Sequence, residues 1–149
     1  MLSREIPAFD SRIRKIARTI THADLTAATN GLEQDLLIGA LPPGAVYLGL
    51  SFRINTYFTG GSASAVTMAL GTGASPGDPD LLQTATNVFD TTTEDVWLKG
   101  TDGILVPMSP LPSVSIYAQF DADAGHTLLA LTAGSVDVEV YYCVPDARV

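Results

Sequence analysis

Few residues in this chain have the types and spacing that catalysis requires. There are two histidines and one cysteine among 149 residues, and the sequence contains neither a phosphate-binding glycine loop followed by Lys-Ser or Lys-Thr nor an H-E-x-x-H zinc motif. General acid–base catalysis needs a positioned base whose pKa suits the task. The candidates are too few to build such a site, so we expect a protein that is not an enzyme.

Metal-binding patterns are equally sparse. His22 and Asp24 are two residues apart, which on a strand would place them on one face. A zinc site needs three or four ligands, however, and the other histidine, His126, is distant in sequence. The D-x-D pairs at 78–80 and 121–123 could supply calcium ligands from loops, but aspartates also cap turns. We expect the turn role, and neither a metal nor a cofactor.

The aromatic residues and the single cysteine suggest little chemistry. Cys143 lies in the apolar context VEVYYCV, which predicts a small buried side chain; as the only cysteine it has no internal disulfide partner. That fits synthesis in a reducing cytoplasm. Most tyrosines fall on predicted strands, where cross-strand packing is their ordinary role. Trp97 lies in an acidic, loop-rich stretch and is the candidate for a carbohydrate-binding loop.

Charge is distributed unevenly along the chain. Residues 1–18 contain five basic residues against two acidic ones, whereas the rest contains three basic residues against fourteen acidic ones. A basic segment can dock on an acidic surface, so we expect an N-terminal arm, residues 1–18, ahead of one domain, residues 19–149. A frayed terminus is the alternative. The residues expected to contact a partner are Arg4, Phe9, Arg12, Arg14, Lys15 and Arg18.

Composition limits the classes of partner. The only basic cluster is this segment in an acidic chain, which argues against nucleic-acid binding. No apolar run is long enough for a signal peptide or a membrane span. Charged residues make up 16% of the chain, below the roughly 25% of typical domains. Either self-association covers part of the surface, or serine and threonine replace charges there.

Alternating apolar residues between Pro- and Gly-rich turns predict an all-β protein. Residues 13–21 are ambiguous, because their isoleucines fall at helical spacing while 19–21 favour a strand; we expect a short turn that leads into a strand ending near His22. Residues 81–89 predict a helical turn or a loop. Residues 128–131 predict a short strand. The other expected strands are 35–41, 45–58, 65–71, 96–99, 114–121 and 136–144. About eight short strands without a clear amphipathic helix favour an antiparallel β-sandwich of jelly-roll type with an extended N-terminal arm.

Three stretches carry a resemblance to a known group: REIPAFDSRIRKIARTITHADLTAA, IGALPPGAVYLGLSFRINTYFTGGSASAVTMALGT with its GDPD continuation, and LTAGSVDVEVYY. The chain resembles small β-sandwich virion proteins of tailed bacteriophages, most of all jelly-roll head-decoration (cement) proteins. The resemblance covers about residues 4–142.

This resemblance implies a protein on the exterior of the virion capsid. Such proteins bind where capsomers meet and cross-link neighbouring subunits of the major capsid protein. It also implies a homo-oligomer, with a trimer favoured over a dimer, and capsid contact through the N-terminal arm. A receptor-binding or carbohydrate-binding module of a tail or spike is the alternative, with Trp97 as its contact.

Overall fold

The computed structural model describes residues 13–73, 77–89, 96–99 and 113–144, with the backbone alone for 96–99. Within these ranges the chain forms eight strands and two short 3-10 turns. They are β1 (Arg14–Thr21), η1 (His22–Asp24), β2 (Gln34–Leu41), β3 (Val46–Gly60), β4 (Val66–Gly71), β5 (Gln83–Asn87), β6 (Val96–Lys99), β7 (Val114–Ala122), η2 (Leu128–Ala130) and β8 (Leu131–Cys143). No helix in this described part is long and apolar enough to cross a membrane.

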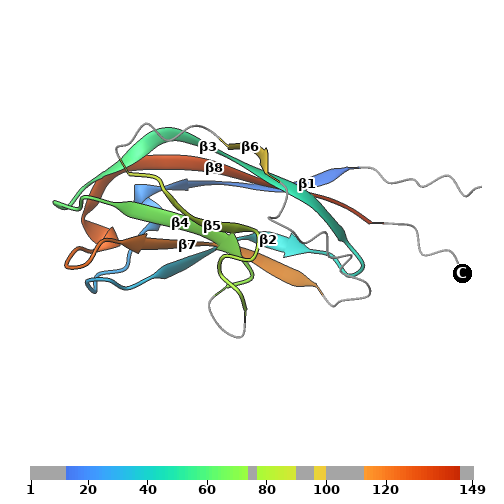
Figure 1. The fold of residues 1–149 in the computed structure, drawn as a ribbon, viewed down its shortest axis with the longest axis horizontal. Coiled ribbons are helices and arrows are strands. Elements are labelled where there is room, and N and C mark those ends of the chain that lie inside the picture. The colour runs from blue at the N-terminus through green and yellow to red at the C-terminus, as the bar shows by residue number, and fades with distance from the viewer. Residues whose placement is uncertain (1–12, 74–76, 90–95, 100–112, 145–149) are drawn as a thin grey trace, which may run out of the picture.

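The strands form two antiparallel sheets that lie face to face as two layers (Figure 1). Sheet A has the order β1-β8-β3-β6 and sheet B the order β2-β7-β4-β5. The predicted all-β, antiparallel sandwich is confirmed. Arg14 pairs with Tyr142, so β1 begins and β8 ends at the same end of the sandwich (Figure 1).

The core lies between the sheets and follows the period-2 pattern of the strands. Val136, Val138 and Val140 of β8 are fully buried, as are Val66, Met68 and Leu70 of β4. The rings of Phe58 and Phe120 meet across the two layers with centroids 5.5 Å apart. Full burial of one such side chain contributes about 1.5–3 kcal/mol. The inward residues expected for 66–70 and 136–140 are therefore confirmed.

The predicted faces of β3 are wrong at its first residues. Strict alternation over the predicted strand 45–58 places Leu48 inward and Tyr47 outward, but Tyr47 is buried and Leu48 is exposed. The register against β8 shifts between Tyr47 and Gly49. Such a β-bulge adds one residue and reverses the side-chain alternation. From Leu50 to Ile54 the predicted alternation holds, with Leu50 and Phe52 buried. The register shifts again between Ile54 and Thr56, and Thr56, expected inward, is exposed.

Two further element assignments are corrected. Residues 83–87 form strand β5, paired with β4, where we expected a turn or loop. Threonine and alanine give this edge strand no apolar alternation, so sheet pairing decides its structure. Residues 128–130 form the turn η2 rather than a strand, and Leu131 already belongs to β8.

The predicted boundary after residue 18 falls inside a strand. β1 begins at Arg14 and pairs with β8 along its whole length. Its inward positions carry Ile16, which packs on the core, and Ile20, which is buried. This apolar alternation makes residues 14–18 part of sheet A rather than of an arm. Residues 1–12, which include Arg4, Phe9 and Arg12, lie outside the described residues.

Candidate functional site

The basic residues that we assigned to an arm lie largely on edge strand β1. Arg14, Lys15 and Arg18 belong to this strand, while residues 1–12 contain Arg4 and Arg12 against Glu5 and Asp10. The positive charge of the first eighteen residues is therefore mostly a property of the rim of sheet A. A partner that binds through this positive charge would therefore contact the sandwich itself.

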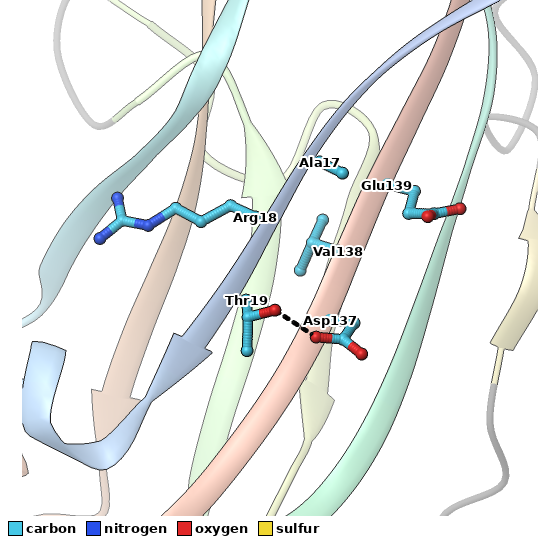
Figure 2. Close-up of a pocket in the computed structure, with 6 residues that line it drawn as sticks. All are labelled: Ala17, Arg18, Thr19, Asp137, Val138 and Glu139. Atoms are coloured by element: carbon cyan, nitrogen blue, oxygen red, sulfur yellow. Dashed lines mark hydrogen bonds between the residues drawn. The ribbon is translucent and has the colours of Figure 1, made fainter.

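Arg18 connects the two sheets. Its Nη1 donates a hydrogen bond to the carbonyl oxygen of Leu37 in β2 at 2.6 Å, and its Nη2 lies 3.6 Å from Oδ1 of Asp24. Figure 2 shows its side chain leaving β1 on the side away from Glu139. Beside this contact, Ile16 of β1 packs against Gly39 of β2. The structure thus gives Arg18 an internal role at the rim of the sandwich.

Lys15 is also engaged within the domain. Its Nζ donates to Oε1 of Glu139 at 2.5 Å, and the hydroxyl of Tyr141 donates to the other oxygen of this carboxylate. The hydrogen bond from Lys15, followed by that from Tyr141, lowers the pKa of Glu139. The same contact raises the pKa of Lys15. The pair is charged at neutral pH and is partly open to solvent.

Asp137 is the second fixed carboxylate of this outer face. It accepts hydrogen bonds from Oγ1 of Thr19 at 2.6 Å and from Nδ2 of Asn55 at 2.8 Å. These two bonds, that of Thr19 first, lower its pKa, and Arg53 opposite it in β3 adds to the effect. Donors on both neighbouring strands therefore fix the position of this ionised group.

Two hollows lie on either side of these carboxylates. One, of about 290 Å³, lies between β1 and β8 and is shown in Figure 2. The other, of about 210 Å³, lies between β8 and β3. Residues of the first are Ala17, Arg18, Thr19, Asp137, Val138 and Glu139. Asp137 and Glu139 border both hollows and form the ridge between them.

Sequence reasoning missed Asp137 and Glu139. The alternation of VDVEVYY places its valines in the core. The same period places Asp137, Glu139 and Tyr141 together on the opposite face. The sequence therefore shows that these three residues share a face. It does not show which residues of β1 and β3 lie beside them.

The end of the sandwich at which β1 begins carries exposed apolar side chains. Ile13, one residue before β1, is 70% exposed, and Leu48 at the bulge of β3 is 40% exposed. Between them lie the partly exposed Cys143 and Val46, which pair with each other. We call Ile13, Val46, Leu48 and Cys143 the terminal patch. Cys143 is thus less buried than its sequence context predicts.

Asp24 of the H-x-D pair and Asp123 of one D-x-D pair take structural roles. Oδ2 of Asp24 accepts hydrogen bonds from the backbone and hydroxyl of Thr21 at 2.8 and 2.9 Å, and the backbone bond is the main cause of its lowered pKa. Asp123 accepts from the backbone and hydroxyl of Ser64, and the hydroxyl is the main cause of its lowered pKa. In the described ranges, no three His, Cys, Asp or Glu side chains group as metal ligands.

Two catalytic patterns lack the required context. Ser64 Oγ donates to Asp123 at 2.8 Å, and Nδ1 of His126 lies 3.1 Å from the same carboxylate. The carboxylate stands between serine and histidine, whereas in a serine triad the histidine itself contacts the hydroxyl, so the order of a triad is not reproduced. Residues 73–77, GASPG, match G-x-S-x-G. That motif activates a serine on a strand-to-helix turn; here it falls between β4 and β5 in the chain, and residues 74–76, its serine among them, lie outside the described residues.

The remaining predicted contact, Trp97, lies on β6, whose backbone pairs with β3 in sheet A. Its side chain lies outside the described residues. Comparison with known proteins adds no identification: no family model, no curated protein and no solved structure matches this chain.

Proposed function

We propose that this protein is a tailed-phage virion component that binds the capsid exterior as a homo-oligomer and cross-links neighbouring major capsid subunits. The sequence resemblance supports this proposal, and so does the architecture. We further propose that the sandwich is of jelly-roll type. In the orders β1-β8-β3-β6 and β2-β7-β4-β5, the first and last strands are neighbours in one sheet. Eight strands arranged as two Greek keys have this property.

The observation that carries the binding proposal is the terminal patch. Ile13 and Leu48 are exposed at one end of sheet A, and the exposed Arg14 follows Ile13 in the chain. Burying an exposed leucine or isoleucine contributes about 1.5–3 kcal/mol, and a neighbouring arginine adds affinity for an acidic surface. Arg14 is therefore the β1 residue that we expect to contact the capsid directly.

Oligomerisation would raise the affinity that one weak contact provides. One patch of this size gives weak binding by itself, but two or three copies held together engage several capsid sites at once. Such multivalency raises the overall affinity by about 10²–10⁴-fold without any new contact. Residues 1–12, which include the predicted contacts Arg4, Phe9 and Arg12, precede β1, and β1 begins at this end of sheet A.

The proposal is tested by cosedimentation with undecorated capsids of the phage that encodes the chain. Wild-type protein is expected to bind saturably, and Leu48→Asp and Ile13→Asp to bind weakly. Leu129→Asp is the matched control, because Leu129 is an exposed leucine in η2, at the opposite end of β8, and is more exposed than Leu48. A chain that starts at Ile13 separates the contribution of residues 1–12.

Each outcome is informative. Failure of an intact wild-type oligomer to bind capsids would refute the capsid proposal. Undiminished binding by both aspartate variants would refute the terminal patch while leaving the capsid assignment in place. Circular dichroism of each variant shows whether it is folded.

A second candidate function is a receptor-binding or carbohydrate-binding module of a tail or spike. The polar hollows on sheet A favour it, and Trp97 on the edge strand β6 of the same sheet is its predicted contact. Under this alternative, Trp97→Ala loses glycan or cell binding, and the wild-type protein does not bind capsids.

A further inference from the structure

The two hollows on sheet A arise from a specific arrangement of large and small residues. Glu139 on β8 has Ala17 of β1 as one cross-strand neighbour and Ser51 of β3 as the other. A long side chain therefore stands between two short ones, and the surface is depressed on both sides of it. Because all three residues lie on paired strands, these depressions belong to the rigid sheet rather than to loops.

We propose that the paired hollows beside Glu139 bind a neutral carbohydrate, whose hydroxyl groups donate hydrogen bonds to Glu139 and Asp137. This inference goes beyond capsid binding and does not rest on it. The site differs from the predicted contact Trp97, which lies on β6, because it lies over β1, β8 and β3.

The first argument is that the acceptors are fixed in place. Thr19 and Asn55 each hold one oxygen of Asp137, at 2.6 and 2.8 Å, and Lys15 and Tyr141 each hold one oxygen of Glu139. An ionised carboxylate accepts about four hydrogen bonds, so each oxygen retains acceptor capacity. Acceptors that are already immobile lose little conformational entropy when a ligand arrives.

The second argument is the balance of charge. Asp137 and Glu139 share this face with Lys15, paired to Glu139, and Arg53, opposite Asp137. Two negative and two positive groups cancel locally, so the face offers no net attraction to an ion. It offers alternating acceptors and donors instead, and a polyhydroxylated neutral ligand complements such a pattern because each hydroxyl both donates and accepts.

The third argument excludes a bound peptide strand. β8 is paired with β1 on one side and with β3 on the other, so its backbone groups are already used and β-strand addition cannot occur there. The ring of Tyr141, beside Glu139, adds an apolar surface with a polar tip. Gly49, opposite Tyr141 in the ladder, has no side chain that could cover it.

The test is a titration of the ¹⁵N-labelled protein followed by amide chemical shifts. The probes are maltotriose, lactose, mannotriose and chitotriose, with triarginine as a cationic probe. We expect at least one sugar to shift the amides of 17–19, 51–53 and 137–139 saturably. Ala17→Leu, which fills the larger hollow, and Glu139→Gln, which keeps the shape and removes the charge, should each weaken binding about tenfold or more.

Ala85→Leu is the control, because Ala85 is an exposed strand alanine in sheet B, and it should bind like the wild type. The proposal is overturned if no sugar shifts these amides, if the shifts map to β6, or if only triarginine binds. It is also overturned if Ala17→Leu binds as well as Ala85→Leu. The amide spectrum reports in the same experiment whether each variant is folded, and Glu139→Gln tests the site independently should Ala17→Leu not fold. None of these measurements involves a capsid.

Discussion

The guanidinium of Arg18 in sheet A donates a hydrogen bond to the backbone carbonyl of Leu37 in sheet B, at 2.6 Å. It joins two strands, β1 and β2, that lie at the ends of their respective sheets. Edge strands have unpaired backbone groups and open easily. A charged donor that satisfies one such carbonyl therefore holds the two layers together at their open side.

Arg18→Ala should lower the free energy of unfolding by about 1–2 kcal/mol, since a hydrogen bond from a charged group contributes about that much when partly exposed. Arg14→Ala, an exposed arginine of the same strand, should change it by less than about 0.5 kcal/mol. Urea unfolding measures both. Equal midpoints for the two variants would show that the contact with Leu37 contributes nothing to stability.

The stability of the sandwich should fall in acid through Asp137. Its pKa is lowered in the folded state from an ordinary value of 3.8. The stabilisation is therefore present above that value and is lost as the pH falls through the lower, folded pKa. Asp137→Asn should lower the free energy of unfolding by about 1 kcal/mol at pH 7. The difference in the free energy of unfolding between this variant and the wild type should shrink when unfolding is repeated at about pH 2. A difference that is independent of pH would contradict this assignment.

Gly134 is required by close packing in β8. It has φ +142°, and a Cβ at this position would overlap the buried ring of Phe58. Gly134→Ala should therefore destabilise the domain by about 3 kcal/mol or more, combining strain and overpacking. Gly125 also has positive φ, +92°, but its added Cβ would meet no atom within 4 Å. Gly125→Ala should cost only about 1 kcal/mol. Thermal unfolding of the pair separates steric overlap from backbone strain, and similar melting temperatures would refute the overlap.

Much of the fold follows from period-2 alternation. The predicted strands 65–71, 114–121 and 136–144 carry valine, leucine and isoleucine on one side only, and the sequence predicts both their existence and most of their inward faces. It does not predict that the last of them begins at Leu131. The sequence does not predict those features of the fold that depend on pairing between strands rather than on apolar alternation. The bulge after Tyr47 depends on the register with β8, and β5 is a strand because β4 offers it an edge.

The candidate sites were less predictable, because they depend on neighbours distant in sequence. Lys15 and Arg18 were singled out for their charge, but their contacts with Glu139 and Leu37 join segments 124 and 19 residues apart. The hollows depend on Ala17 and Ser51 being placed on both sides of Glu139. No local pattern carries that information.

The central claim is that this protein reinforces a capsid, and the most direct test is the thermal stability of undecorated capsids of its phage. Capsid disruption is followed by light scattering while purified protein is added in increasing amounts. We predict that the disruption temperature rises and then saturates at one fixed ratio of protein to capsid subunit, because a ligand that binds only the intact shell stabilises it. An unchanged disruption temperature at every ratio, with the added oligomer intact, would contradict the proposal.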